Sequence, residues 1–427
     1  MQRALAYALS PAPRVPLRFL LTAPWFALLA ALVLLWSGEA AFASRWSSAL
    51  LGATHLLTLG YLSMAMAGSM LQLIPVVTGT ALAPGRLSAV AAWAALVLGA
   101  LTLSAALALN LARLFIPAAL LLAAAFILLA VPIARALAAP ASCGAMPMVR
   151  GMRMALGALL ITGLLGLALA SHFGALAPMP VLLLADLHAA WGLVGWVALL
   201  VVCVSFQVIP MFQATQIYPP LVTRWAVWIL LGSLAAWSAA WIGAPDYARG
   251  AGFPLAASLA GFAALSAWLL AARRRKNVDA TTLYWRLSFA SLATSALLYL
   301  AADGMALFIG VLFIAGFAMG AVNGMLYKIV PFLLWYHMQQ DRRAKKGDVP
   351  VLRTIISDRC ARRQFWCHAA AVAVLLGAVQ WPALLARPAA ALLAVASLCL
   401  ALDLLRAAHR CRRVQKSLQQ TPLGQGE

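Results

Sequence analysis

The sequence predicts an all-α, polytopic integral membrane protein with twelve transmembrane helices in three tandem four-helix units. Two of the observations behind this prediction concern composition: 65% of the 427 residues are hydrophobic and only 10% are charged, and the mean hydropathy is +0.95. A soluble globule of this length needs far more polar surface. The third observation is a helix pattern that recurs along the chain. The lipid bilayer is therefore the first partner that we expect.

Twelve apolar runs are close to the length of about 20 residues that a helix needs to cross hydrocarbon. They lie near residues 17–36, 49–75, 87–109, 113–138, 151–171, 183–210, 222–243, 251–272, 284–302, 305–334, 367–386 and 388–405. We expect one transmembrane domain over 1–427, with a cytoplasmic loop at about 338–365. The first run could also be a cleaved signal, since Ala41-Phe-Ala43 comes after it, but its length and the parity of the later runs favour a retained helix.

The net charge of +21 is distributed unevenly along the chain. With both termini in the cytoplasm, all but four of the 31 Lys and Arg residues face inward, the exceptions being Arg45, Arg113, Arg249 and Arg387. This asymmetry agrees with the positive-inside rule. It accounts for the basic charge without nucleic acid as a partner, and it predicts a multi-pass protein of the bacterial cytoplasmic (inner) membrane with both termini inside.

Two of the long runs share one pattern, with a histidine near the start and Gln-x-x-Pro at the end. The first runs from His55 to Pro75 and the second from His188 to Pro210. A third run ends in Lys328-Ile-Val-Pro331 and has no histidine at the matching position. The prolines are 135 and 121 residues apart, and each interval holds four runs. We therefore predict internal repeats over about 17–138, 151–272 and 284–405.

Two further positions are alike in the three copies. The residue seven before the proline is small, and the residue three before it is polar; these are Gly68, Cys203 and Gly324, and Gln72, Gln207 and Lys328. Proline inside a helix frees the carbonyl group four residues earlier. We expect the polar side chains to satisfy such carbonyl groups; the alternative is a polar cluster or proton entry on the inner side.

The two histidines are the strongest candidates for a functional site. His55 lies 20 residues before its proline and His188 lies 22 before, which puts each of them ~30 Å outward along a helix. Both should therefore lie near the outer face at similar depth. Ionisable residues within spans are costly and usually functional, and imidazole binds both iron and copper. The alternative is a plain hydrogen bond between helices.

Other polar residues near the ends of spans are weaker candidates. His172 and Asp186 lie on the outer side, where they could support or join a metal site; the alternative is an interfacial position facing water. His337, His368 and His409 lie beside basic loops, and we expect them to be solvated or interfacial.

The arrangement resembles a known family. Twelve spans in three arcs, with histidines entering helices two and six from their outer ends, are similar to the catalytic subunit (subunit I) of the heme-copper oxidase superfamily. The phrase His55-x4-Gly60, with Gly68 and Pro75-Val-Val-Thr-Gly79 after it, also resembles the NnrS-type membrane proteins associated with nitric-oxide metabolism. The likeness in topology covers nearly the whole chain, whereas the likeness in motif is confined to the histidine helices and a remnant in helix ten.

The resemblance implies a role for each histidine. His55 matches the histidine that ligates the low-spin heme of the oxidases, and His188 matches a histidine that binds their copper. The family's other ligands are missing: Gly192 stands where a tyrosine is expected, span 222–243 has no His-His pair, and span 305–334 has no His-x-His. Met319 is a candidate substitute for the second heme ligand, although packing is the alternative. We expect a degenerate member rather than a complete terminal oxidase.

The resulting hypothesis is a protein that binds heme b or copper through His55 and His188. It would act in respiratory electron transfer or in nitric-oxide or metal handling, with another respiratory membrane subunit or a cytochrome as the implied partner. Whether it is an enzyme stays open. The alternatives are a secondary transporter, which twelve spans with internal repeats also fit, and an assembly partner of a respiratory complex without a metal.

Overall fold

The computed structural model describes residues 11–80, 82, 86–139, 144–275, 277–340 and 349–420, and this part of the chain is helical with no strand. Ten of its helical stretches are long and apolar enough to cross a membrane. They are Arg14–Phe42, Ser48–Thr78, Leu87–Ala108, Ala112–Ala138, Met146–Phe173, Val181–Gln213, Pro220–Gly243, Pro245–Ala271, Ala306–Gln339 and Pro382–Lys416. The prediction of an all-helical, multi-pass membrane protein is confirmed.

Individual helices succeed one another with short connections. In chain order they are α1 (Arg14–Ser37), η2 (Gly38–Phe42), α2 (Ser48–His55), η3 (Leu56–Ser63), α3 (Met64–Thr78), α4 (Arg86–Ala108), η4 (Ala112–Leu114), α5 (Phe115–Ala138), α6 (Met146–Phe173), α7 (Val181–Ala190), η5 (Trp191–Ala198), α8 (Leu199–Gln213), α9 (Pro220–Gly243), α10 (Pro245–Ala251), α11 (Phe253–Ala271), α12 (Ala280–Ala301), α13 (Ala306–Gly310), η6 (Val311–Ala318), α14 (Met319–Gln339), α15 (Leu352–Ile355), α16 (Asp358–Gln380) and α17 (Pro382–Gln420).

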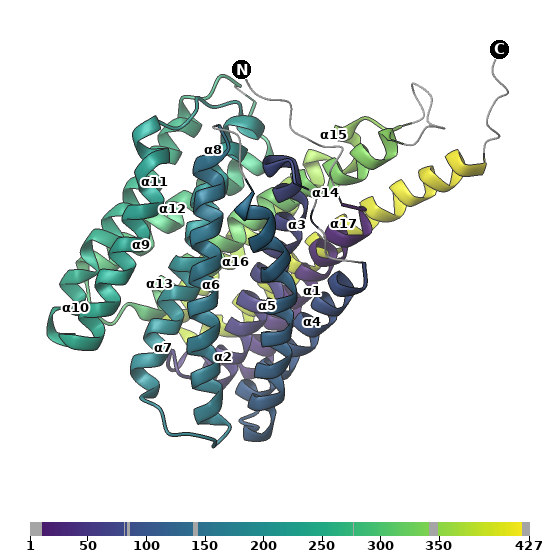
Figure 1. The fold of residues 1–427 in the computed structure, drawn as a ribbon. Helices are drawn as coiled ribbons and strands as arrows, with labels where there is room; N and C mark the ends of the chain where they lie inside the picture. The colour runs from purple at the N-terminus through teal and green to yellow at the C-terminus, as the bar shows by residue number, and fades with distance from the viewer. Residues whose placement is uncertain are drawn as a thin grey trace, which may run out of the picture.

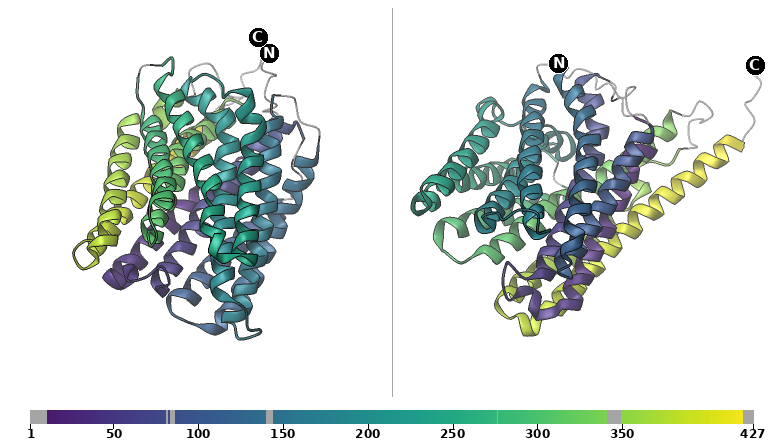
Figure 2. Two further views of the ribbon diagram at one scale, coloured as in Figure 1. Left: turned by 90° about the vertical axis from the view of Figure 1, so that its left-hand side faces the viewer. Right: turned by 60° about the horizontal axis from the view of Figure 1, so that its bottom comes forward.

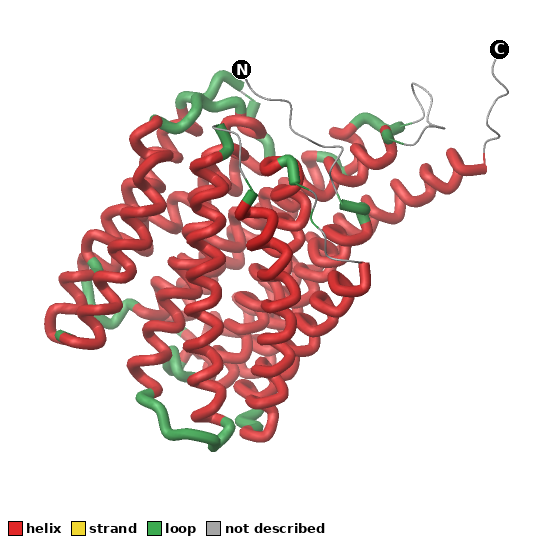
Figure 3. The backbone as a smooth tube through the Cα atoms, viewed as in Figure 1, coloured by secondary structure: helices red, strands yellow, loops and turns green. Residues whose placement is uncertain are grey.

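The helices form one bundle with loops at its two ends (Figure 1, Figure 3). α1 begins and α17 ends at the same end of the bundle, beside α15, and we call this the termini end. The last turns of α17 project beyond the other helices at this end (Figure 2). α2 and α7 lie towards the opposite end (Figure 1).

Two helices, α12 and α16, fall where the sequence predicts spans but are not among the ten apolar ones. The last predicted boundary also moves. The break lies at Trp381, between α16 and α17, and not at 386–388. Pro382 opens α17, and the residue before a proline avoids the helical conformation; Pro388 lies inside α17 without ending it.

The predicted polar loop at 338–365 is shorter than expected. α14 continues to Gln339, and α16 already begins at Asp358, where the Ser357 side chain accepts a hydrogen bond from the Cys360 N–H group. The hydroxyl of Ser357 is a favourable helix cap. Residues 341–348 lie outside the described part of the chain.

Each of the three repeated helices contains a π-helical segment of eight residues, namely η3, η5 and η6. These segments begin 19, 19 and 20 residues before Pro75, Pro210 and Pro331, so they are at equivalent places in the pattern. π-helical turns are rare and occur frequently at functional sites. The three repeated helices therefore share a local distortion as well as a sequence pattern.

The repeated helices also meet one another in the interior. Trp196 of η5 donates a hydrogen bond to the Ser63 hydroxyl of η3 at 3.3 Å, and the Tyr61 hydroxyl of η3 donates to Asn323 Oδ1 of α14 at 2.5 Å. All four side chains are buried. Polar groups buried in this way are tolerated because they are paired, and here the pairs join helices from different parts of the sequence.

A glycine fifteen residues before the proline is present in all three helices and marks close packing. A Cβ atom there would lie 2.1 Å from a side-chain atom of α1, 2.9 Å from one of α6 and 2.3 Å from one of α12. The pairs are Gly60 with Phe26, Gly195 with Ala158, and Gly316 with Ser291. Each repeated helix thus packs closely on the long helix that precedes it, as small residues allow.

Candidate metal site

The structure brings His55 and His188 together although 133 residues separate them in sequence. Their ring centroids are 6.1 Å apart and their planes differ by 19°. His55 is the last residue of α2, where η3 begins, and His188 lies in α7 shortly before η5. Both side chains are partly buried. The pair therefore lies where two of the three distorted helices approach each other.

The hydrogen bonds of the two rings fix which nitrogen is available. Nδ1 of His55 is 2.8 Å from the Leu51 carbonyl oxygen, and Nδ1 of His188 is 3.0 Å from the Thr162 carbonyl oxygen. Because a carbonyl oxygen only accepts, each Nδ1 carries the proton. In a neutral imidazole the lone pair is then on Nε2. In a metal-binding histidine, the nitrogen that does not bind the metal commonly donates its hydrogen to a backbone carbonyl group.

A glycine of α6 makes room for the second ring. A Cβ atom at Gly166 would lie 3.0 Å from Cε1 and 3.4 Å from Nδ1 of His188. Gly166 is one turn beyond Thr162, whose carbonyl group binds that ring. Gly163, in the same helix, would have no atom within 4 Å of an added Cβ. The absence of a side chain at Gly166 therefore lets His188 reach the main chain of α6.

Asp186, a predicted candidate, is occupied by another contact. Its carboxylate accepts hydrogen bonds from Arg45 at 2.7 Å and 3.4 Å, one to each oxygen. The Arg45 guanidinium also lies over the Trp46 ring, 4.5 Å from its centroid. This bidentate pair joins the segment before α2 to α7, two residues from His188. Asp186 thus links the elements that carry the two histidines, and both of its oxygens are used.

His172 and Met319 lie elsewhere. Nδ1 of His172 accepts a hydrogen bond from the Met179 N–H group at 3.0 Å, in the turn after α6. The side chain lines a small cavity of about 220 Å³ with residues 175–178. Met319 is the first residue of α14 and is 1% exposed within the apolar core. The structure gives neither residue a contact with the histidine pair.

Sequence reasoning placed His368 at a basic, solvated surface, and this prediction was wrong. His368 lies in the middle of α16 and its side chain is only 1% exposed. Its Nε2 is 3.0 Å from the Ala315 carbonyl oxygen of η6. Its Nδ1 is buried and has no hydrogen-bond partner among the described residues. The apolar residues after His368 place it within the helix, a signal that the nearby arginines obscured.

Among the residues that the structure describes, no three His, Cys, Asp or Glu side chains gather as a metal-ligand group. The histidine pair could therefore offer a metal two protein ligands. A structural zinc site uses four, so the pair does not resemble one. Two imidazoles suit a metal that brings its other ligands with it, such as heme iron, or an ion that accepts low coordination, such as Cu(I).

A comparison with models of known protein families finds no match for the chain, and a comparison with curated protein sequences finds none either.

Proposed function

We propose that His55 and His188 together hold one metal centre, either heme b iron or copper. The observation that carries the proposal is the pair of parallel rings at 6.1 Å, each with its Nδ1 bonded to a main-chain carbonyl group. The two rings lie close enough that His55 and His188 could both reach one metal, which would supply the redox or ligand-binding chemistry.

The protein's own contribution is orientation. The carbonyl groups of Leu51 and Thr162 hold the rings and direct the Nε2 lone pairs. The ion pair of Arg45 and Asp186 ties the two histidine-bearing elements to each other. When bound, heme or copper would supply one-electron chemistry or a site for a small gas. We propose that the protein serves respiratory electron transfer, or nitric-oxide or metal handling, beside another respiratory membrane subunit or a cytochrome.

We further propose twelve crossings in three units of four helices, related to subunit I of the heme-copper oxidases and to NnrS-type proteins. Three π segments and three packed glycines at equivalent positions support the threefold repeat. The charge asymmetry supports a bacterial inner membrane with the termini end in the cytoplasm. The missing ligand motifs of the seventh and tenth spans argue against a complete terminal oxidase.

Metal analysis of the purified protein, together with its visible absorption spectrum, tests the site. We expect iron with a Soret band, or copper, at about one equivalent per chain, and we expect His55→Ala and His188→Ala each to remove it. His337→Ala, in α14 near the termini end, is the matched control and should keep the full complement. If the wild-type protein contains neither metal, or if His337→Ala loses as much as His55→Ala, the proposal is wrong.

A further inference from the structure

A large cavity lies at the termini end, on the side of the bundle away from the histidines. Its volume is about 1070 Å³. It lies between the last turn of α8, the middle of α14 and the first turns of α12 and α16, with α15 across it. Two of the helices around it therefore begin there, and the N-terminal end of a helix carries partial positive charge.

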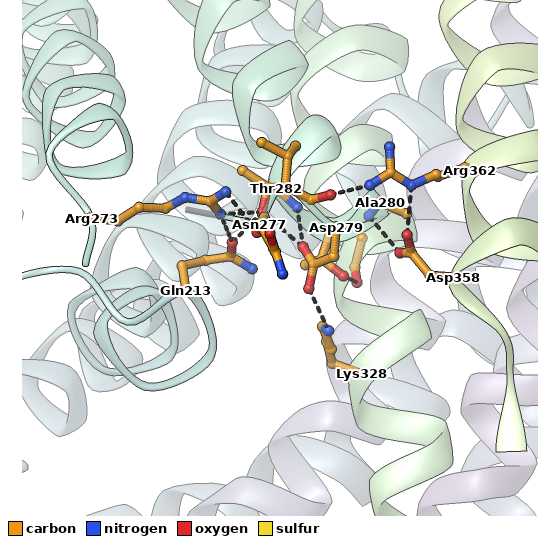
Figure 4. A network of polar contacts seen from close by, with 12 residues as sticks. Gln213, Arg273, Asn277, Asp279, Ala280, Thr282, Lys328, Asp358 and Arg362 are labelled. Carbon is orange, nitrogen blue, oxygen red and sulfur yellow. Dashed lines mark hydrogen bonds and ion pairs between the residues drawn. The ribbon is translucent and has the colours of Figure 1, made fainter. Parts of the chain in front are cut away.

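Four cationic side chains and two carboxylates line this cavity. Both carboxylates are already paired, as Figure 4 shows. Asp279 accepts from Lys328 at 2.8 Å, and Asp358 accepts from Arg362 at 2.5 Å and from the Ala280 N–H group at 2.9 Å. Burial opposes ionisation of Asp279, but the hydrogen bonds from Lys328 and Thr282 outweigh it and lower the pKa of that carboxyl group.

The two remaining cations, Arg275 and Arg353, form no ion pair with any described residue. Both are exposed at the edge of the cavity. The cavity thus has an excess of positive charge that the described chain does not neutralise, and this favours an anion.

The remaining wall is apolar. It includes Met211 and Phe212 at the end of α8, Pro331 and Phe332 of α14, and Leu352 of α15. Met211 and Leu352 are 42% and 37% exposed, so part of this apolar wall is open. If a small hydrated anion were bound, this apolar surface would stay exposed to water. An anion that carries acyl chains would cover it.

We infer that this cavity binds the phosphate headgroup of an anionic phospholipid from the leaflet at the termini end, with the acyl chains against the apolar wall. The end of α8 and the beginnings of α12 and α16 line the cavity, so it lies near one end of the bundle, where a headgroup would meet hydrocarbon. Basic pockets between helices hold such headgroups. Arg275 and Arg353 contact the phosphate. The site is independent of the proposed metal centre at the other end of the bundle.

The inference also gives a role to the one polar residue that differs among the three repeats. Lys328 stands where the other copies have Gln72 and Gln207. We expected it to satisfy a carbonyl group freed by proline, but it forms the ion pair with Asp279 instead. Its charge neutralises a carboxylate that would otherwise repel the phosphate. The third repeat therefore carries a lysine where the others carry glutamine, and an anion site beside Asp279 requires that positive charge.

Lipid binding to the delipidated, full-length protein tests the inference. Native mass spectrometry would compare phosphatidylglycerol, phosphatidylcholine and the water-soluble headgroup glycerol phosphate. We expect phosphatidylglycerol to bind more tightly than phosphatidylcholine and to raise the thermal unfolding midpoint. The double variant Arg275→Gln/Arg353→Gln should bind phosphatidylglycerol roughly 30-fold more weakly, because we expect the two arginines to contribute about equally to the affinity for the lipid.

The control is Arg412→Gln/Arg413→Gln, which removes the same charge from exposed positions of α17 outside the cavity. It should bind phosphatidylglycerol as the wild type does. Equal binding of both lipids, or equal losses in the two double variants, would overturn the inference. If glycerol phosphate reproduces the whole stabilisation, the cavity is a site for soluble phosphates and the lipid assignment is wrong.

Discussion

The Nδ1 atoms of His55 and His188 both donate to main-chain carbonyl groups, and these bonds decide which nitrogen each ring presents. Had either Nδ1 been bonded to a donor, the ring would present an N–H group, which cannot bind a metal. In neither bond is the histidine's partner a side chain. The orientation of the pair therefore depends on the helix backbones and on the space beside them.

Gly166 provides that space, so Gly166→Ala should disturb the site more than the fold. Its Cβ would lie 3.0 Å from Cε1 of His188, so the ring would have to move away from the Thr162 carbonyl group. We expect a shifted absorption spectrum or a loss of metal, with a nearly unchanged unfolding midpoint. Gly163→Ala is the control, because no atom lies within 4 Å of its Cβ. If the two variants have the same spectrum and metal content, Gly166 does not position His188.

The pair of Asp279 and Lys328 should make stability depend on pH. The pKa of Asp279 is lowered on folding, so the pair stabilises the protein above the unfolded-state pKa of about 3.9 and loses this effect as pH falls through the folded pKa. Asp279→Asn should lower the free energy of unfolding at pH 7 by roughly 1.5–3 kcal/mol. The difference from wild type should shrink as the pH falls through the folded-state pKa of Asp279.

Thermal unfolding between pH 3 and pH 7 measures this effect. Asp303→Asn is the control, because Asp303 pairs with Arg249 at an exposed position and such pairs contribute little. A constant difference between Asp279→Asn and wild type over the whole range would show that the charge of Asp279 is not the cause.

At the scale of helices, the repeated element is a long helix with a π segment, a packed glycine and a proline. The constant distance of Gly60, Gly195 and Gly316 from the three prolines was not part of the predicted pattern. Glycine is common throughout the apolar runs, so the pattern becomes visible only when the partner helices are known. In each copy the partner is the preceding long helix.

Gly60→Ala should therefore destabilise the protein. The added Cβ would lie 2.1 Å from Cδ1 and 2.7 Å from Cβ of Phe26, so the ring cannot simply rotate away. Overpacking of this kind costs roughly 1–3 kcal/mol. Gly157→Ala, in α6, has nothing within 4 Å of its Cβ and should be neutral or stabilising. Unfolding midpoints in detergent would compare them, and equal midpoints would contradict the packing argument.

At the scale of the whole molecule, the open question is whether α12 and α16 also cross the membrane. Both are long and lie within the bundle, yet they are less apolar than the ten candidate spans. α12 has 11 buried residues, among them serines and threonines, and packs on α14 through Gly324 and Tyr284. A helix that is enclosed by other helices needs less hydrophobic surface than one that faces lipid.

Reporter fusions would decide the count. We expect a fusion after Asn277 to report the cytoplasm and one after Asp303 to report the outside, because α12 lies between them. Fusions after Ser357 and after Trp381 should differ in the same way, because α16 lies between them. If the two reporters around either helix fall on the same side, that helix does not cross and the count of twelve is wrong.

Apolar length alone was enough to predict the helical class and a chain that crosses the membrane many times, because lipid imposes that requirement on the sequence. The shared depth of His55 and His188 could be predicted from their distance to the prolines. Their contacts could not be predicted: the carbonyl group of Thr162, the room beside Gly166 and the pairing of Asp186 with Arg45 all depend on helices distant in sequence. The π segments have no known composition that would reveal them.

These π segments allow the length of a helix to change without changing the direction in which all of its residues face. In a straight helix, each added residue both lengthens the helix and rotates all later residues by about 100°. Removing one residue from η3 would turn His55 away from His188, while the inner half, packed through Gly68 and carrying Pro75, would stay in place. A single insertion or deletion can thus create or abolish the pair without rebuilding the bundle. Chains that share this framework can accordingly differ in whether the two histidines meet.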